Sequence, residues 1–244
     1  DLSGGVLSRA ELSGARITRA NLTGADWLET RIGAVDLSGS TLGECNLLNA
    51  DLSGARFAGV DLSGANLIDC TLDGADLSGA TLTKTTFVRC SGRDVSFRRA
   101  SFRQGVMAHG SSFPGADFRD ADLDQATLRG TALAGARFDR ANLAGADLSE
   151  CDAKEASFER TSVKGGMLIR TNLAGASLRG ANMMDALASK ARIPGADFTG
   201  ANLYRADLSR VVGDKDTTFT EAEVGRVRFL PRAAALTRGE RGDA

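Results

Sequence analysis

The chain has 244 residues; hydrophobic residues make up 42% of it, only 5% are aromatic, and glycine occurs 29 times. This composition is too poor in bulky side chains for a conventional globular core and too apolar for a disordered chain. The 31 acidic residues nearly balance 30 basic ones, which argues against direct nucleic-acid binding. No apolar run approaches the about 20 residues that span a membrane.

An apolar residue recurs every five positions, and we call these positions centres. Of the 22 centres from 2 to 107, 21 are Leu, Ile, Phe, Met or Trp, and all 11 phenylalanines of the chain lie at centres. One extra residue near 108–112 shifts the register, which resumes at Phe113 and continues to Leu208. A second irregular stretch, 211–218, precedes the last centres at Phe219, Val224 and Phe229.

The residues around each centre predict a short extended unit followed by a sharp turn. A period of five matches neither the 3.6 of a helix nor the 2 of a strand. The centre and the small residue two before it, such as Ala15, are expected to point inward, and the two neighbours of the centre outward. Glycine two after the centre suits the positive φ of a type II turn, and Pro114-Gly115 and Pro194-Gly195 favour the same turn.

The repeated motif A-[DN]-L-x-x occurs as Ala50-Asp51-Leu52-Ser53-Gly54 and as Ala201-Asn202-Leu203-Tyr204-Arg205. It resembles the pentapeptide-repeat family over residues 1 to about 230. The resemblance implies an all-β fold, a right-handed quadrilateral parallel β-helix with four pentapeptides per coil. About eleven coils would form a rod of roughly 50–55 Å, since stacked strands lie ~4.8 Å apart. Residues 231–244 are expected to form a tail, a short helix followed by disorder.

A period of 20 residues is also visible in the charges. Stacked coils favour alternating signs, because like charges in neighbouring strands repel. One column of residues before the centres reads Arg16, Asp36, Arg56, Asp76, Ser96, Asp117 and Arg137. The square coil therefore has support from the residues themselves.

The residues that resemble reactive groups fit structural positions. The four cysteines, Cys45, Cys70, Cys90 and Cys151, all lie at the small inward position, where cysteine acts as a small buried hydrophobe. A disulfide between Cys70 and Cys90, one coil apart, is the alternative. One histidine, His109, cannot complete a zinc site. We expect no catalytic, metal or cofactor-binding residue, and therefore no enzyme.

The location that we expect is the cytoplasm, because free buried thiols suit a reducing compartment. The chain starts at Asp1, inside a repeat and without an initiator methionine. We therefore expect an upstream segment, which hides any targeting signal.

Apolar residues that should point outward gather on one face. We call it face 2, and its centres are Leu7, Trp27, Leu47, Leu67, Phe87, Met107, Leu128, Leu148, Leu168, Ala188 and Leu208. It carries an N-terminal ridge, Leu28, Leu48, Ile68 and Val88, and a C-terminal patch, Met167, Ile169 and Leu187. Two residues after the centres runs a charged column: Arg9, Glu29, Asp69, Arg89, Glu150, Arg170, Lys190 and Arg210. An apolar ridge beside a charged rim is typical of protein interfaces.

A second candidate surface is a basic band formed by Lys84, Arg89, Arg93, Arg98, Arg99 and Arg103. These residues lie close together in the sequence, between a more acidic N-terminal part and the rest of the chain. The band is a candidate docking site for an acidic partner.

The function that these features favour is a non-catalytic scaffold or adaptor that docks a protein partner, or a second copy of itself, through face 2. One alternative, implied by the resemblance, is a DNA mimic that inhibits or protects a type II topoisomerase such as DNA gyrase. A DNA duplex carries one charge per ~1.7 Å, whereas the net charge here is −1. Another alternative is a C-terminal module of a larger bacterial accessory protein or effector of type VI secretion.

Overall fold

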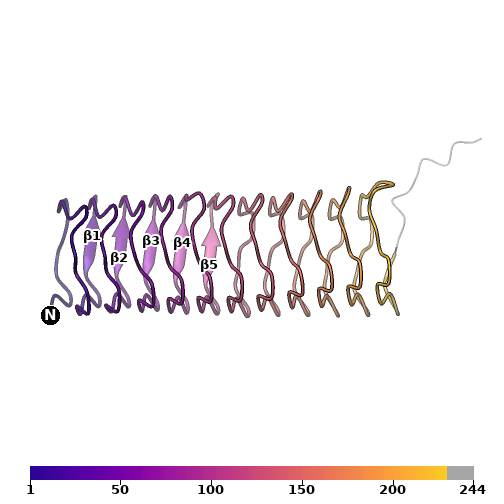
Figure 1. Ribbon diagram of the computed structural model, residues 1–244, viewed down its shortest axis with the longest axis horizontal. Coiled ribbons are helices and arrows are strands. Elements are labelled where there is room, and N and C mark those ends of the chain that lie inside the picture. The colour runs from indigo at the N-terminus through magenta and orange to yellow at the C-terminus, as the bar shows by residue number, and fades with distance from the viewer. Residues whose placement is uncertain (230–244) are drawn as a thin grey trace, which may run out of the picture.

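The computed structural model describes residues 1–229, which wind into a long, straight stack of coils (Figure 1). Successive coils run parallel, with Glu11 beside Arg31 and Arg31 beside Asp51, so that one coil contains 20 residues. The described residues contain no helix, and the all-β parallel β-helix expected from the sequence is confirmed. The expected tail at 231–244 lies outside the described residues.

Five short strands form one parallel sheet on face 2, in the order β1-β2-β3-β4-β5 (Figure 1). They are β1 (Asp26–Leu28), β2 (Asn46–Leu48), β3 (Asn66–Ile68), β4 (Thr86–Val88) and β5 (Val106–Ala108). Elsewhere in residues 1–229, neighbouring coils pair through single bridges at the residue before each centre. Each strand extends this pairing to the centre and the residue after it.

The strands exist where the turn after the centre is open. In most five-residue repeats, the backbone amide of the residue three positions after the centre donates a hydrogen bond to the carbonyl of the centre. Thr131 donates to Leu128 in this way at 3.0 Å. Residues 1–229 contain no such bond to Trp27, Leu47 or Phe87. The residue after the centre therefore stays extended there, a conformation that branched apolar residues favour.

The interior is filled by the centres and the small residues between them. A continuous stack of parallel rings passes through four coils. Ring centroids lie 4.6 Å apart for Phe97 and Phe118, 4.8 Å for Phe118 and Phe138, and 4.9 Å for Phe138 and Phe158. Because each ring packs on the next coil, the core is a column of repeated contacts between neighbours.

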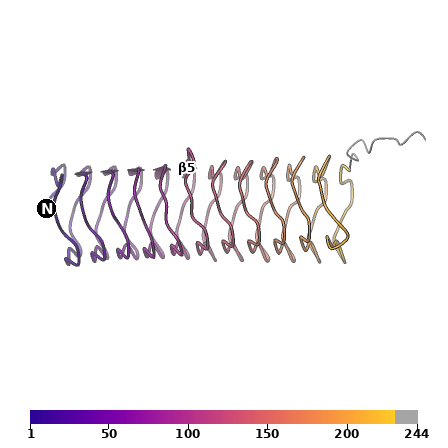
Figure 2. The same ribbon diagram turned by 90° about the horizontal axis from the view of Figure 1, so that it is seen from above.

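The first shift of register forms an outward loop after β5. Ser91 pairs with Ser112, 21 residues on, and the extra residue is accommodated by His109 and Gly110, which have φ of 55° and 82° and are exposed. Ser111 returns to the small inward position, where its hydroxyl donates to the carbonyl of Ala108 at 2.8 Å. The loop stands out beyond the row of neighbouring turns (Figure 2).

The corners of the coils have positive φ whether or not they contain glycine. Within residues 1–229, nineteen glycines have positive φ, and so do 26 other residues, with φ between 52° and 64°. The sequence predicted this conformation for glycine only. The left-handed conformation costs an L-residue roughly 1–2 kcal/mol, and stacking on neighbouring coils imposes it. Charged residues at corners can in return pair across coils, as Arg205 does with Asp185 at 2.8 Å.

The four cysteines are free and buried. Each sulfur lies near the carbonyl oxygen of the residue 23 positions earlier: 2.9 Å for Cys45 and Leu22, 3.3 Å for Cys70 and Leu47, 3.3 Å for Cys90 and Leu67, and 2.9 Å for Cys151 and Leu128. The hydroxyl of Thr161 makes the same contact with Phe138, at 2.6 Å. At this position cysteine therefore acts both as a small buried hydrophobe and as a hydrogen-bond donor in the place that threonine takes in other repeats.

All four native thiols are expected to resist Ellman's reagent at about pH 8, reacting at least ~100-fold more slowly than in the unfolded chain. Burial raises the pKa of Cys45 and raises that of Cys151 to about 12. The hydrogen bond between Cys70 and Cys90, followed by burial, raises the pKa of Cys90, whereas the same hydrogen bond lowers the pKa of Cys70. The reactive thiolate is thus depleted at Cys45, Cys90 and Cys151 at this pH, and Cys70 is protected because it is buried away from the reagent. Fast labelling of Cys70 or Cys90 before unfolding would contradict this packing.

Candidate protein-binding face

The structure places the N-terminal ridge as one straight ladder. Leu28 pairs with Leu48, Leu48 with Ile68, and Ile68 with Val88, in register across β1 to β4. Leu28 is 36% exposed and the other three are partly exposed. Neighbouring strands lie ~4.8 Å apart, so the four side chains form a continuous apolar strip on the outer surface of the sheet.

The C-terminal patch lies on the same face but not in the same line. Met167 and Leu187 precede their centres and pair with each other across one coil step, whereas Ile169 follows its centre, as the ridge residues do. Leu187 is 41% exposed. Polar residues such as Asp147 and Arg129 lie on the coils between, so the ridge and the patch are two separate apolar areas.

The charged column borders both apolar areas and is partly paired within itself. Arg9 binds Glu29 at 2.9 Å, and Arg170 lies 3.7 Å from Glu150. The Arg89 guanidinium donates two hydrogen bonds of 2.7 Å to Asp69 and holds the pKa of that carboxyl below its usual value. Lys190 and Arg210 have no ion pair within residues 1–229. The column is therefore neutralised near the ridge and basic near its C-terminal end.

The basic band is not brought together on one face. Faces 1, 3 and 4 contain the centres Leu82, Gly92 and Phe97, and the band is distributed over all four faces: Lys84 and Arg103 on face 1, Arg89 on face 2, Arg93 on face 3, and Arg98 and Arg99 on face 4. Three of its arginines have acidic neighbours: Arg89 with Asp69 at 2.7 Å, Arg98 with Asp120 at 4.0 Å, and Arg103 with Asp122 at 3.1 Å and Asp124 at 2.8 Å.

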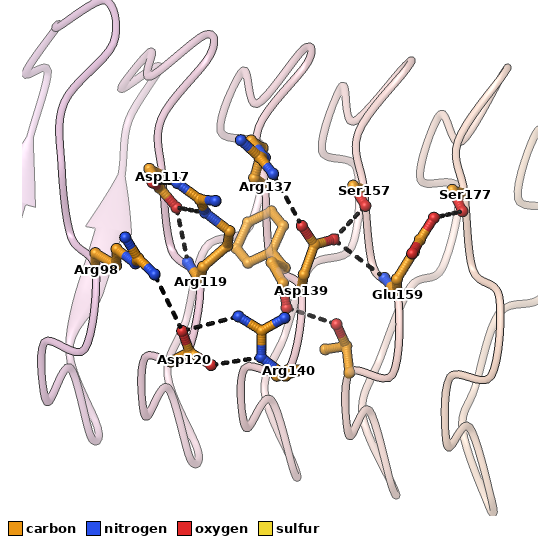
Figure 3. A network of polar contacts seen from close by, with 12 residues as sticks. Arg98, Asp117, Arg119, Asp120, Arg137, Asp139, Arg140, Ser157, Glu159 and Ser177 are labelled. Atoms are coloured by element: carbon orange, nitrogen blue, oxygen red, sulfur yellow. Dashed lines mark hydrogen bonds and ion pairs between the residues drawn. The ribbon is translucent and has the colours of Figure 1, made fainter.

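Face 4 shows how the charges of this rod are satisfied internally (Figure 3). Asp120 accepts hydrogen bonds of 2.7 and 3.0 Å from Arg140 and lies 4.0 Å from Arg98. Its pKa is lowered, first of all by Arg140. Asp117 pairs with Arg119 at 2.5 Å and lies in the alternating column predicted from the sequence. Face 4 is polar and cross-linked, in contrast to the apolar areas of face 2.

Within residues 1–229, no group of three or more His, Cys, Asp or Glu is placed to hold a metal ion. The described residues also form no helix of the length and hydrophobicity needed to cross a bilayer. His109 lies exposed in the loop after β5.

Comparison with known structures found several pentapeptide-repeat proteins. HetL, involved in heterocyst differentiation regulation in the cyanobacterium Nostoc, is 26% identical, with 90% of this chain and 89% of that chain covered and a TM-score of 0.42. QnrB1, a plasmid-mediated fluoroquinolone resistance protein, is 19% identical, with 88% and 93% covered and a TM-score of 0.48. A protein of the Arabidopsis thaliana thylakoid lumen is 30% identical, with 53% and 65% covered and a TM-score of 0.31.

A comparison with curated proteins gave no significant match. The family model for pentapeptide repeats matches in 8 copies, over residues 1–26, 34–69, 70–107, 108–140, 131–166, 167–203 and 181–212. These matches cover most of the chain, which therefore belongs to the pentapeptide-repeat proteins.

Proposed function

We propose that this protein is a non-catalytic interaction scaffold that docks a protein partner through face 2. The observation that carries the proposal is the in-register ladder of Leu28, Leu48, Ile68 and Val88 on the outer surface of a sheet. Apolar side chains at four successive coils form a contiguous area, and such areas mark interaction sites more often than scattered apolar residues do.

Comparison with the equivalent positions on face 1 supports the choice of face. The residues after its centres in the same coils are Thr23, Gly43, Ser63 and Thr83. They have the same place in the repeat, so the coil itself does not require an apolar residue there. The charged column beside the ridge supplies the polar rim that surrounds the apolar part of most interfaces.

The double substitution Leu48→Lys and Ile68→Lys is expected to abolish docking, because two charges would have to be desolvated in the apolar part of the interface. The matched control is Thr23→Lys with Thr83→Lys, which adds the same charge at the same repeat position on face 1. The measurement is capture of binding proteins from an extract of the source cells by the immobilised chain, with circular dichroism to verify folding.

We expect the wild type and the face 1 control to capture the same proteins, and the face 2 variant to retain less than about a tenth of them, a loss of at least 1.4 kcal/mol in binding. Retention of the captured proteins by the face 2 variant would exclude face 2 as the docking surface. Equal loss in both variants would do the same.

A further inference from the structure

We propose that face 2 docks on face 2 of a second copy, with the two rods antiparallel and the two-fold axis midway between the coils of Met107 and Leu128. This inference rests on the proposed function and names its partner. Two-fold dimers present the same surface to each other, so the face must be complementary to its own reverse. The order of charges in the charged column satisfies that condition.

Reversing the column about this axis places every charge from Glu29 to Arg210 opposite an opposite or neutral residue, and the position opposite Arg9 lies outside the described residues. Glu29 meets Arg210, Asp69 meets Arg170, and Arg89 meets Glu150 of the other copy, and the symmetry makes each pair twice. Lys190 meets the neutral Asn49. Opposite charges across an interface fix its register as well as its partner.

A shift of one coil in either direction destroys this match. With the axis on the coil of Met107, Asp69 meets Glu150 and Arg9 meets Arg210. With the axis on the coil of Leu128, Arg89 meets Arg170. Like charges at an interface are costly, and only the intermediate register avoids them in this column.

The loop after β5 fits the same register. His109 and Gly110 are exposed at the corner of face 2 beside the proposed axis. The loop after β5 stands out beyond the neighbouring turns there (Figure 2), and a projecting loop would separate two flat faces. In the matched register His109 meets Gly130 of the other copy. Gly130 is the one glycine in the charged column between Arg9 and Arg210, so the loop meets the position that has no side chain.

Most large side chains after the centres of face 2 in one copy would face small side chains of the other copy. A two-fold axis across the rods sets residues after the centres opposite residues after the centres, and Ile68 then meets Ile169. The other ridge residues meet serines: Leu28 with Ser209, Leu48 with Ser189, and Val88 with Ser149. Large residues facing small ones allow the two faces to pack closely.

One like-charged pair remains outside the charged column. Asp26 meets Asp207, both of which precede their centres. Each already has a neighbour that compensates it: Asn46 donates to Asp26 at 2.9 Å, and Arg228 lies 3.8 Å from Asp207. This pair weakens the dimer in the proposed register, where the charged column supplies the opposing preference.

The expected dimer is weak because face 2 is narrow. Nine coil steps of ~4.8 Å and three extended residues across give roughly 430 Å² on each copy, against about 800 Å² for a stable standard interface. Dimerisation should therefore depend on concentration in the micromolar range.

The test is sedimentation equilibrium of the full chain and of two charge-reversal variants, Asp69→Arg and Arg170→Asp. Each variant alone places like charges opposite each other twice, and its dimer should dissociate at least about tenfold more readily than the wild type. Mixed together, the two variants restore both pairs between different chains. The mixture should recover a dissociation constant within about threefold of the wild type.

The matched control is Asp120→Arg, which removes the same kind of bidentate pair, with Arg140, but on face 4. It should dimerise as the wild type does, and circular dichroism should show equal folding of all variants. Failure of the mixture to recover, or a wild type that stays monomeric up to about 500 μM, would overturn the dimer. If Leu48→Lys with Ile68→Lys still blocks capture of another protein in that case, the proposed function stands without this partner.

Discussion

Replacing Phe118 with alanine is expected to lower the free energy of unfolding by about 3–5 kcal/mol, because the lost ring leaves a cavity in a core that cannot collapse. The ring stacks on Phe97 at 4.6 Å and on Phe138 at 4.8 Å. Both contacts lie between coils, so the substitution removes packing across two coil steps. Urea unfolding followed by circular dichroism measures the effect.

The control for this prediction is Phe118→Leu, since leucine is the commonest residue at centres. It should cost about 1–2 kcal/mol, because the coil remains filled but the ring stack is broken. Hydrogen exchange should show faster opening in the coils of Phe97, Phe118 and Phe138 and little change near Leu22, since coils contact only their neighbours. An alanine variant as stable as the leucine variant would refute the role of the stack.

Replacing Gly105 with alanine is expected to destabilise the protein by about 1–3 kcal/mol through overpacking. A Cβ atom there would lie 2.5 Å from Cδ2 and Cζ of Phe102 and would also clash with Cε2 of that ring. Phe102 is buried against Phe87, with ring centroids 5.9 Å apart, so its ring has little space to move. The loss should appear as a lower midpoint in urea.

A second substitution, Phe102→Leu, should rescue this variant. Leucine followed three residues later by alanine is the pair that other coils of face 1 contain, as Leu62 with Ala65 and Leu123 with Ala126. The double variant is expected to fall within about 1 kcal/mol of the wild type, and the two changes should couple by at least about 1 kcal/mol. Additive losses would show that Gly105 and Phe102 do not share this space.

The coil and its interior could be predicted from the sequence because every contact recurs. The centres, the inward cysteines and the alternation of Arg16, Asp36 and Arg56 all follow from periods of 5 and 20 residues, and the structure pairs Arg16 with Asp36 and Asp36 with Arg56. The ladder from Leu28 to Val88 follows from the same arithmetic. A feature that recurs with the period of the coil can be recognised in a single sequence without an alignment of related sequences.

What does not repeat could not be predicted in this way. The residues of the basic band are close in the sequence, but 20 residues of chain pass over all four faces. Lys84 and Arg93 therefore lie on different faces of the rod. Val95 fills the space that a side chain at residue 92 would occupy, because its Cγ2 atom lies 2.5 Å from the position that a Cβ atom of Gly92 would take. Such local adjustments depend on three-dimensional packing and leave no periodic signal.

The corners of the coil allow the surface to change while the backbone stays the same. In the part of the chain that the structure describes, 19 glycines and 26 other residues share a left-handed conformation. A substitution at a corner therefore alters charge without altering the path of the chain. Corners on one face are ~4.8 Å apart, and the residue at each corner can change independently of the others. The choice of binding partner in such a rod can therefore evolve by one corner substitution at a time, and a single corner residue can make two surfaces complementary or incompatible.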